Sequence, residues 1–302
     1  MSAPTTEVTA ARPATPGPQV EPERGSASPM ERADHRCVPA TVLATTRVAP
    51  QLHRLTLAVT GLAGWAPLGP DEFVGLVLPR PGTRLPDLSG ITGPNPRPVV
   101  AALPEPVRPD VRWYTVAAHR PAPELQGDRS TEGGTTEIDV DVVLHPPGEV
   151  DEGPGATWVR RARPGDELAV QTGTTCYHPP ATARTRLVAG DETAYPALRR
   201  ILQEEGDVEL HAVLEVDVED ALPPLPRPRR GSVDVVLREG RPPGEALLAH
   251  LRSAELPDLD YGWVVGEQDL AARVRRHLVR DRGLARTSVY FCAYWILGRP
   301  RG

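Results

Sequence analysis

Three residues within one short stretch have the types and the spacing to hold a flat cofactor. The stretch reads RWYTVAAHR, residues 112–120, and it contains Arg112, Tyr114 and Thr115. An aromatic face can pack on a planar ring, a hydroxyl can hydrogen-bond a ring heteroatom, and a guanidinium can pair with phosphate. This combination is typical of a strand that binds a flavin. The pattern is incomplete, because Ala117 and Ala118 stand where a second cation would meet the phosphates.

The composition excludes several other classes of function. The chain has 302 residues, a net charge of -6 and 34 basic residues, none of which is a lysine. Nucleic acid is not expected as a partner, because phosphate binding needs concentrated positive charge and these arginines are interleaved with acids. The absence of lysine excludes Schiff-base chemistry. The chain has no GxSxG or HExxH motif and no metal-ligand spacing, so we expect neither hydrolysis nor a bound metal.

The same inspection predicts a cytoplasmic protein with no membrane segment. No run approaches the roughly 18 apolar residues of a membrane helix, and the N-terminus lacks the profile of a signal peptide. The cysteines Cys37, Cys176 and Cys292 are widely separated, which fits a reducing compartment. Residues 1–36 are rich in Pro, Ala, Ser and Thr, so we predict a disordered tail there. The sequence indicates no oligomeric state.

Two hydrophobic patterns divide the rest of the chain. From 37 to 180, apolar and polar residues alternate between Gly- and Pro-rich turns, as in EIDVDVVLH at 137–145. This alternation predicts half-buried strands and a six-stranded antiparallel β-barrel. From 184 to 302, short apolar runs alternate with helical stretches such as TAYPALRRILQEE at 193–205. The second pattern predicts a doubly wound, mostly parallel α/β domain, so the fold class is β + α/β.

Further candidate cofactor-binding residues follow two strands of the predicted sheet. Asp191, Glu192 and Thr193 come after one strand, and Gly266 and Glu267 come after another. Ligands of doubly wound sheets bind beyond the carboxyl ends of the strands. Thr193 is the expected N-cap of the next helix, although the site lacks a GxGxxG fingerprint. The acids could equally be first-turn residues that stabilise the helix dipole, and both interpretations stay open.

Six stretches resemble one family of flavoproteins. They are RWYTVA (112–117), VDVVLH (140–145), GPGATWVRRARPGDELAV (153–170), LVAGDETAYPAL (187–198), WVVGE (263–267) and AYWILG (293–298). In this order and near these spacings, they resemble the siderophore-interacting protein family of the ferredoxin-reductase superfamily over about residues 40–302. The resemblance implies FAD bound on the barrel, NAD(P)H as the electron source and a ferric siderophore as the electron acceptor.

The resemblance also implies roles for individual residues. The implied contacts to the isoalloxazine and ribityl groups are Arg112, Tyr114 and Thr115, with His145 near the diphosphate or adenine. The implied phosphate-binding turn consists of Gly155, Ala156, Thr157 and Trp158. The implied substrate contacts are Tyr294, Trp295, Ile296 and Arg299. No side chain needs to act as a general acid or base, because the flavin carries the chemistry.

The chain departs from the family pattern on both the cofactor and the substrate side. Ala117 stands where many members have a second arginine, and Ala156 stands near the place of a phosphate-binding serine. The acidic loop at 149–152 would repel a diphosphate. Ile296 follows the final Tyr-Trp pair, where members commonly have a cation. The candidate replacements for the missing cations are Arg120, Arg160, Arg161 and Arg299.

Three hypotheses about function follow, each with a small molecule as the partner. The first is a flavoprotein reductase, in which NAD(P)H reduces FAD and electrons then pass singly to a ferric chelate. The second is a member that has lost its redox role and uses the flavin cleft to cyclise or tailor an apolar metabolite in a biosynthetic pathway. The third is a protein that binds a siderophore or flavin without turnover. The six stretches favour the first hypothesis, and the departures favour the others.

Overall fold

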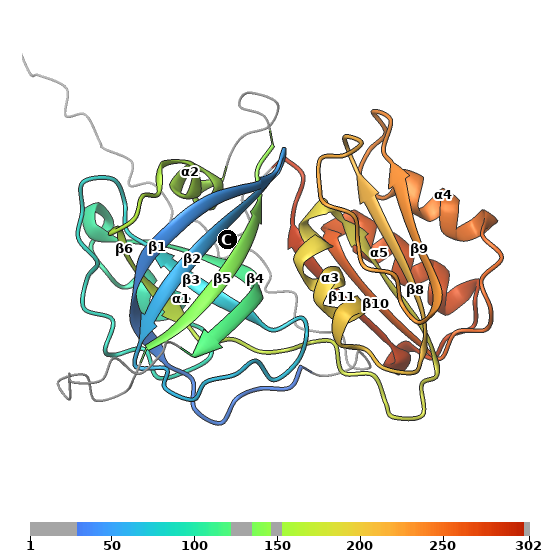
Figure 1. The fold of residues 1–302 in the computed structure, drawn as a ribbon, viewed down its shortest axis with the longest axis horizontal. Coiled ribbons are helices and arrows are strands. Elements are labelled where there is room, and N and C mark those ends of the chain that lie inside the picture. The colour runs from blue at the N-terminus through green and yellow to red at the C-terminus, as the bar shows by residue number, and fades with distance from the viewer. Residues whose placement is uncertain (1–28, 122–134, 146–152, 299–302) are drawn as a thin grey trace, which may run out of the picture.

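The computed structural model describes residues 29–121, 135–145 and 153–298, which form two domains side by side (Figure 1). The strands of the first domain are β1 (Cys37–Ala49), β2 (Leu52–Thr60), β3 (Phe73–Leu78), β4 (Asp110–Pro121), β5 (Thr135–Val143) and β6 (Glu167–Gln171). They form a closed barrel in the order β1-β2-β5-β4-β3-β6, and the paired strands are antiparallel. The predicted six-stranded antiparallel barrel is therefore confirmed.

Alternate residues of the strands fill the barrel interior. Leu55 and Leu57 of β2 and Ile138 of β5 are fully buried there. Helix α2 (Pro154–Arg161) adds Trp158 to the same core. The sequence suggested only a turn before Trp158, whereas the structure has a helix with proline in its first turn, where a missing N–H costs nothing.

A long connection between β3 and β4 covers part of the barrel's outer face. It contains α1 (Arg97–Ala101) and the 3-10 helix η1 (Glu105–Val107). Its apolar residues pack on alternate residues of β3, β4 and β6 in a separate small cluster. The buried members of this cluster are Val77, Leu88, Ile91, Val100, Val111 and Ala169.

The chain makes ordered contacts before the first strand begins. Met30 forms a β-bridge with Thr175, and Arg32 pairs with Glu72 at 2.8 Å. Residues 29–36 therefore pack along the barrel, although the sequence places them in the predicted tail. The rest of that tail, 1–28, lies outside the described residues.

The second domain is a parallel sheet flanked by helices. Its elements are β7 (Thr185–Asp191), η2 (Glu192–Ala194), α3 (Tyr195–Glu204), β8 (Glu209–Val216), β9 (Arg230–Leu237), α4 (Glu245–Ser253), β10 (Tyr261–Glu267), α5 (Gln268–Arg280), η3 (Arg286–Ser288) and β11 (Val289–Trp295). The strand order is β11-β10-β7-β8-β9, and the paired strands are parallel. The predicted doubly wound α/β domain is confirmed, and the strand order reverses between β7 and β10.

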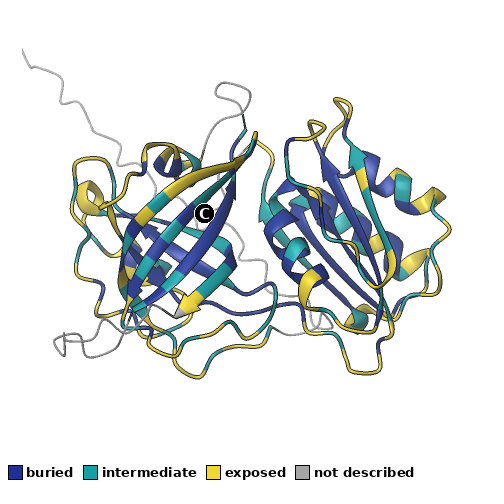
Figure 2. Ribbon diagram, viewed as in Figure 1, coloured by how far each residue is buried: buried dark blue, intermediate teal, exposed yellow. Residues whose placement is uncertain are grey.

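The two faces of this sheet pack on different helices. Helix α3 lies on the face turned toward the barrel, whereas α4 and α5 lie on the far face (Figure 1). Figure 2 shows the central strands buried along their length, with more exposed residues on the edge strand β9. The α3 side shares one hydrophobic cluster with Leu52 and Phe73 of the barrel, so the domain junction is partly apolar.

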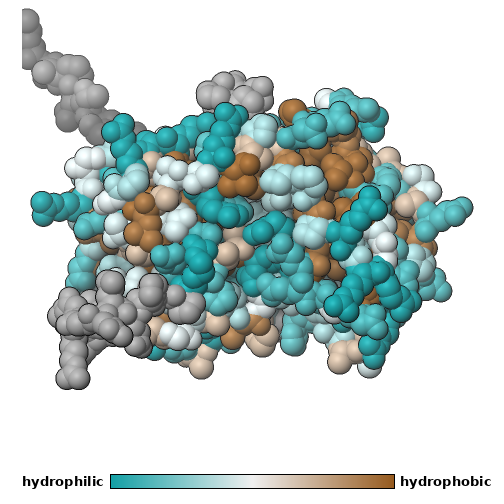
Figure 3. Space-filling view, in the orientation of Figure 1, coloured by the Kyte–Doolittle hydropathy of each residue, from teal (hydrophilic) through white to brown (hydrophobic). Residues whose placement is uncertain are grey.

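The molecular surface is mixed. The face in Figure 3 is mostly hydrophilic, and its hydrophobic areas are separate from one another. Within the described ranges, no helix has both the length and the apolar character needed to cross a lipid bilayer.

Candidate functional site

Strand β4 presents its predicted flavin-binding residues on two faces. Tyr114 packs against the barrel core, and burial raises the pKa of its hydroxyl to about 12, so the group stays protonated at neutral pH. Thr115 is buried on the opposite face, because successive residues of a strand alternate in direction. Arg112 Nη1 donates a hydrogen bond to the carbonyl of Val111 at 2.7 Å. The three predicted residues are therefore neighbours, but they do not all face one surface.

The first turn of α2 lies directly against this strand. A side-chain carbon added at Gly155 would collide with the Tyr114 hydroxyl and lie 3.1 Å from Arg112 Cγ. Glycine at this position thus brings the helix N-terminus beside Arg112. The N-cap residue Gly153 makes no side-chain hydrogen bond to the first turn. A helix N-terminus without a side-chain cap suits an anion such as phosphate.

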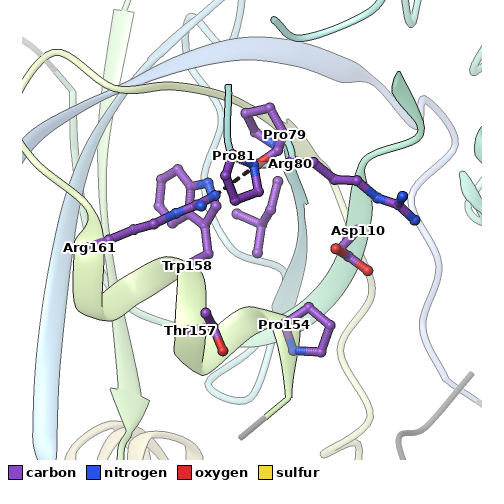
Figure 4. Close-up of a pocket in the computed structure, with 9 residues that line it drawn as sticks. Pro79, Arg80, Pro81, Asp110, Pro154, Thr157, Trp158 and Arg161 are labelled. Atoms are coloured by element: carbon purple, nitrogen blue, oxygen red, sulfur yellow. Dashed lines mark hydrogen bonds between the residues drawn. The ribbon is translucent and has the colours of Figure 1, made fainter. Parts of the chain in front are cut away.

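A cavity of about 220 Å³ lies between α2 and the end of β3 (Figure 4). It is lined by Leu78, Pro79, Arg80, Pro81, Asp110, Pro154, Thr157, Trp158 and Arg161. Arg161 reaches from α2 toward the carbonyl of Pro79, to which its Nη2 donates at 3.2 Å. Arg80 extends away from the helix (Figure 4). The cavity combines two guanidinium groups with one carboxylate, that of Asp110, beside a helix N-terminus.

The predicted phosphate-binding turn divides between this cavity and the barrel. Thr157 is exposed at the cavity, and its hydroxyl lies 3.3 Å from the carbonyl of Gly153. Trp158 is buried and forms the inner wall. Ala156 is half-buried and packs against the barrel core, so its missing hydroxyl leaves no gap in the cavity wall.

The candidate replacement cations have different surroundings. Arg120 Nη1 pairs with Asp139 at 2.7 Å and its Nε with Glu137 at 3.1 Å, so its charge is already compensated. Arg160 donates to the carbonyl of His145. Of the three candidates that the structure describes, Arg161 lines the cavity. The fourth candidate, Arg299, and the acidic loop at 149–152 lie outside the described residues.

Ala117 lies at the domain junction and not beside α2. It is 4% exposed, and its carbonyl accepts a hydrogen bond from Arg199 Nη2 at 2.9 Å. The preceding carbonyl, of Val116, accepts from Arg200 Nη1 at 3.1 Å. Both arginines belong to α3, which packs across this end of β4. The expectation that position 117 lies at the phosphate end stays a prediction, and the structure places α3 beside it.

The predicted flavin strand meets the last strand of the sheet at this junction. Phe73, the strand partner of Thr115, packs in the same hydrophobic cluster as Tyr294 of β11. Burial raises the pKa of Tyr294 well above its usual value, so this hydroxyl is neutral. Trp295 Nε1 donates to Asp191 Oδ2 at 2.9 Å, and Ile296 is half-buried beside it. The structure therefore brings Tyr294 near Thr115, whereas Trp295 lies against Asp191 at the edge of the sheet.

The acids at the sheet edge are used in internal hydrogen bonds. Asp191 Oδ1 accepts from the backbone N–H of Thr193 at 3.0 Å, and Oδ2 accepts from that of Glu267 at 2.6 Å. Glu267 in turn caps α5. A side chain at Gly266 would lie 2.5 Å from Asp191 Oδ2, and the residue has φ of 131°. For Asp191 and Glu267 the geometry favours the structural interpretation.

The predicted helix cap at Thr193 is wrong. Asp191 caps η2 instead, and the Thr193 hydroxyl donates to Asp191 Oδ1 at 2.5 Å. Helix α3 begins two residues later, at Tyr195, and its N-cap residue Ala194 makes no side-chain hydrogen bond. The extra 3-10 turn separates the threonine from the start of the helix.

Glu192 and His145 approach each other across the domain junction. His145 Nε2 lies 3.7 Å from Glu192 Oε1, and Arg238 Nη2 lies 2.7 Å from Glu192 Oε2. Burial, reinforced by the neighbouring Asp191 carboxylate, raises the pKa of Glu192 to about 7. This carboxyl therefore titrates near neutral pH at the edge of the sheet.

Sequence reasoning missed several residues of the site region. Asp71 is fully buried, where it accepts hydrogen bonds from Thr175, from the backbone of Tyr177 and from Trp263 Nε1 of the other domain. Arg80 and the α3 arginines were also missed. The partners of Asp71, Arg199 and Arg200 lie far away in the sequence, so no local spacing could reveal them. Across the described ranges, no group of three or more His, Cys, Asp or Glu residues could hold a metal ion.

A closed six-stranded barrel followed by a parallel α/β sheet defines the ferredoxin-reductase-like class of proteins. Within that class, two family descriptions match this chain. The siderophore-interacting FAD-binding domain matches residues 41–174, and the siderophore-interacting protein domain matches residues 183–298. The chain belongs to the siderophore-interacting protein family, as the six stretches predicted.

Individual relatives agree with this assignment. The mycobactin import ATP-binding/permease protein IrtA of Mycolicibacterium smegmatis is 27% identical over 89% of this chain, which spans about a quarter (26%) of IrtA. The ferric vibriobactin reductase ViuB of Vibrio cholerae is 25% identical over 60% of this chain and 67% of its own length. The siderophore-interacting protein SipS of Aeromonas hydrophila has a TM-score of 0.66 at 25% identity, covering 88% of this chain and 93% of SipS. None of these supports the cyclase alternative, and the family places the chain among flavin-dependent oxidoreductases.

Proposed function

We propose that this protein is an NAD(P)H-dependent, FAD-containing reductase of ferric siderophores. The observation that carries the proposal is the packing of Phe73, the strand partner of Thr115, in one hydrophobic cluster with Tyr294 at the domain junction. A flavin ring held at Thr115 would lie on the barrel and also at the carboxyl edge of the sheet, where a nicotinamide would approach. Bound FAD would accept a hydride and release electrons one at a time, which is chemistry that side chains cannot supply.

The donors around α2 fit the phosphate end of such a cofactor. Arg161 and Arg80 line the cavity, Arg112 adjoins the first turn of the helix, and the helix N-terminus has no side-chain cap. Charge-assisted hydrogen bonds to phosphate contribute about 1.5–3 kcal/mol each. We assign Arg161 as the main phosphate contact, because it reaches from the helix across the cavity (Figure 4).

The protein's own residues would orient the ring and keep the site dry. The neutral Tyr114 hydroxyl stays fixed under Gly155, and Thr115 supplies a hydroxyl to a ring heteroatom. Trp295 is held by Asp191, which also holds the backbone of Glu267. These contacts keep β7, β10 and β11 together at the edge where the nicotinamide would lie.

The electron acceptor follows from the family and from the relatives. ViuB is a ferric vibriobactin reductase and IrtA imports mycobactin, so we propose a ferric siderophore as the acceptor here. The ferric iron is reduced by one electron at a time, and the ferrous ion binds its chelate more weakly and can be released.

The proposal is tested by adding FAD and either NADH or NADPH to the purified protein with a ferric hydroxamate chelate. Ferrous iron is captured with a coloured ferrous-specific chelator. We expect ferrous iron to form in proportion to the nicotinamide oxidised, at two irons per hydride. A rate no greater than that of free FAD with the same reagents would contradict the proposal.

A matched pair of variants tests the phosphate site. Arg161→Ala removes the cavity guanidinium, and Arg280→Ala removes an exposed arginine of α5 in the other domain. We expect Arg161→Ala to raise the Kd for FAD by about 10-fold or more, because one charge-assisted contact is lost. If the two variants have equal Kd values for FAD, the FAD phosphates do not bind at Arg161.

A further inference from the structure

The carboxyl ends of β8 and β9 form the part of the sheet edge that lies away from the proposed flavin position. The strand order is β11-β10-β7-β8-β9, and Tyr294 of β11 packs with the barrel residue Phe73, the strand partner of Thr115 (Figure 1). Ligands of such a sheet lie along the carboxyl ends of its strands. A nicotinamide cofactor whose ring meets a flavin at Thr115 would therefore have its adenosine half over β8 and β9.

Arg238, directly after β9, is already held by carboxylates of the protein. Its backbone N–H donates to the carbonyl of Val216 at 2.9 Å, which places it beside the end of β8. Its Nε donates to Glu215 Oε1 at 3.0 Å and its Nη2 to Glu192 Oε2 at 2.7 Å. The side chain is 9% exposed. An arginine can accommodate the 2′-phosphate of NADPH, but this guanidinium is not available for that role.

The segments that follow the two strands, residues 217–222 and 238–241, are otherwise acidic. Their acids are Asp217, Glu219 and Asp220 after β8 and Glu239 after β9. Arg241 pairs with Glu239 at 2.8 Å, so both arginines of these segments are paired with carboxylates. A phosphate monoester is largely dianionic at neutral pH. A 2′-phosphate at this edge would therefore meet like charge without a guanidinium to compensate it.

Asp217 is the acid at this edge that a ribose hydroxyl can reach. Glu215 is fully buried, where its Oε1 accepts from the backbone N–H of Gly244 at 2.8 Å and its Oε2 from that of Leu247 at 2.9 Å. The side chain of Asp217 is 38% exposed, and its Oδ1 lies 3.9 Å from Arg238 Nη1, beyond hydrogen-bond distance. An acid after a strand of the sheet accepts a hydrogen bond from the ribose 2′-hydroxyl of NAD.

A second observation at the same edge indicates a hydrogen-bonding ligand. Glu192, directly after β7, is 1% exposed, and its Oε1 has no hydrogen-bond partner among the described residues. His145 Nε2 lies 3.7 Å from this oxygen, and Arg238 binds the other oxygen of the carboxylate. A buried acceptor without a donor is costly, so an edge that keeps one is suited to a polar ligand that brings donors.

We propose that the electron donor is NADH and not NADPH, and that Asp217 determines this specificity. The Asp217 carboxylate accepts a hydrogen bond from the 2′-hydroxyl of the adenosine ribose. In NADPH this hydroxyl is replaced by a phosphate, which Asp217, Glu219 and Asp220 repel while Arg238 stays with its own carboxylates. This inference rests on the proposed function, because it names the electron donor of that reaction.

The test uses ligands that cannot donate a hydride. ADP-ribose and ADP-ribose 2′-phosphate contain the adenosine halves of NADH and NADPH and lack the nicotinamide. Calorimetric titration of the FAD-loaded protein gives their Kd values. We expect ADP-ribose to bind at least about 10-fold more tightly than its 2′-phosphate at low salt, because of like-charge repulsion. The difference should narrow at high salt, which screens exposed charges.

Variants assign the preference to Asp217. Asp217→Asn should reduce the ratio of the two Kd values by about 3- to 10-fold, because one exposed negative charge is removed. Asp217→Arg should reverse the preference, since its guanidinium can pair with the 2′-phosphate. Asp258→Asn, at an exposed acid that precedes β10 at the other edge of the sheet, should leave the ratio unchanged and is the matched control. Thermal unfolding of each variant shows whether it is folded.

Three results would overturn the inference. They are equal or tighter binding of the 2′-phosphate, no binding of either ligand, and an Asp217→Asn variant whose ratio matches that of Asp258→Asn. These measurements need no electron transfer, so their failure is distinct from failure of the proposed function. Reduction of ferric chelates with NADPH as fast as with NADH would support the proposed function and contradict this specificity. The expected Kd ratio without reduction by either nicotinamide would do the reverse.

Discussion

Gly155 shows how one residue positions a helix against the strand predicted to bind the cofactor. Its lack of a side chain lets α2 lie against the Tyr114 hydroxyl, which the sequence pattern could not reveal because the two residues are 41 positions apart. The sequence did predict Tyr114 and Thr115 as site residues, since their types and spacing are local. It could not predict that Asp191 and Glu267 are used in internal hydrogen bonds, because their partners come from other strands.

A pair of substitutions measures the contact at Gly155. Gly155→Ala alone should lower the free energy of unfolding by about 1–2 kcal/mol, because its methyl group collides with the Tyr114 hydroxyl. In a Tyr114→Phe background the hydroxyl is absent, and alanine should then be neutral or stabilising by up to about 1 kcal/mol, since it favours helix over glycine. Chemical denaturation of the four proteins checks this. Equal effects of Gly155→Ala in both backgrounds would contradict the described contact.

The pKa of Glu192 gives a pH dependence of stability. Because the pKa is raised from 4.5 to about 7 on folding, the folded state binds this proton more tightly than the unfolded state. The stability from this group is complete below pH 4.5 and is lost as the pH rises through about 7. The groups that face Glu192 are Asp191, His145 and Arg238.

Comparison with Glu192→Gln isolates this contribution. Between pH 5 and pH 8 the unmodified protein should lose about 2 kcal/mol more unfolding free energy than Glu192→Gln. Glu239→Gln, at an exposed acid, should behave like the unmodified protein. If the free energy of unfolding changes with pH in the same way for Glu192→Gln and the unmodified protein, the pKa of Glu192 is not raised by folding.

At the level of elements, α2 packs beside Arg112 near one end of β4 and α3 packs on the other end. The sequence predicted α3 from its helical spacing but read α2 as a turn, because an eight-residue helix that opens with Pro-Gly gives a weak local signal. Helix α3 uses Arg199 and Arg200 to hold the backbone of β4. Position 117 is thus a buried site against α3.

Inserting an arginine tests this view of Ala117. Ala117→Arg should lower the free energy of unfolding by more than about 2 kcal/mol, because a charge is buried against α3 without a partner. It should not tighten FAD binding. Ala118→Arg, at the half-buried neighbouring position, is the control and should cost less. Tighter FAD binding by Ala117→Arg would show that position 117 does face the phosphates.

At the scale of the whole molecule, both domain folds were predictable and their packing was not. The alternation of apolar and polar residues predicted the barrel, and the alternation of strands with helices predicted the parallel sheet. Both patterns can be read from local sequence. The junction depends on contacts such as Trp263 with Asp71 and Tyr294 with Thr115, whose partners are more than 170 positions apart. We propose that hydride transfer and electron release take place at that junction.

One spectroscopic experiment tests this central claim most directly. The protein is loaded with FAD under anaerobic conditions, and the flavin absorbance near roughly 450 nm is followed on addition of NADH or NADPH and then of a ferric hydroxamate chelate. We predict that the nicotinamide bleaches the band and that the chelate restores it, with two ferric ions consumed per flavin. A flavin that stays oxidised with both nicotinamides, or one that is bleached but does not reoxidise with the chelate, would contradict the account.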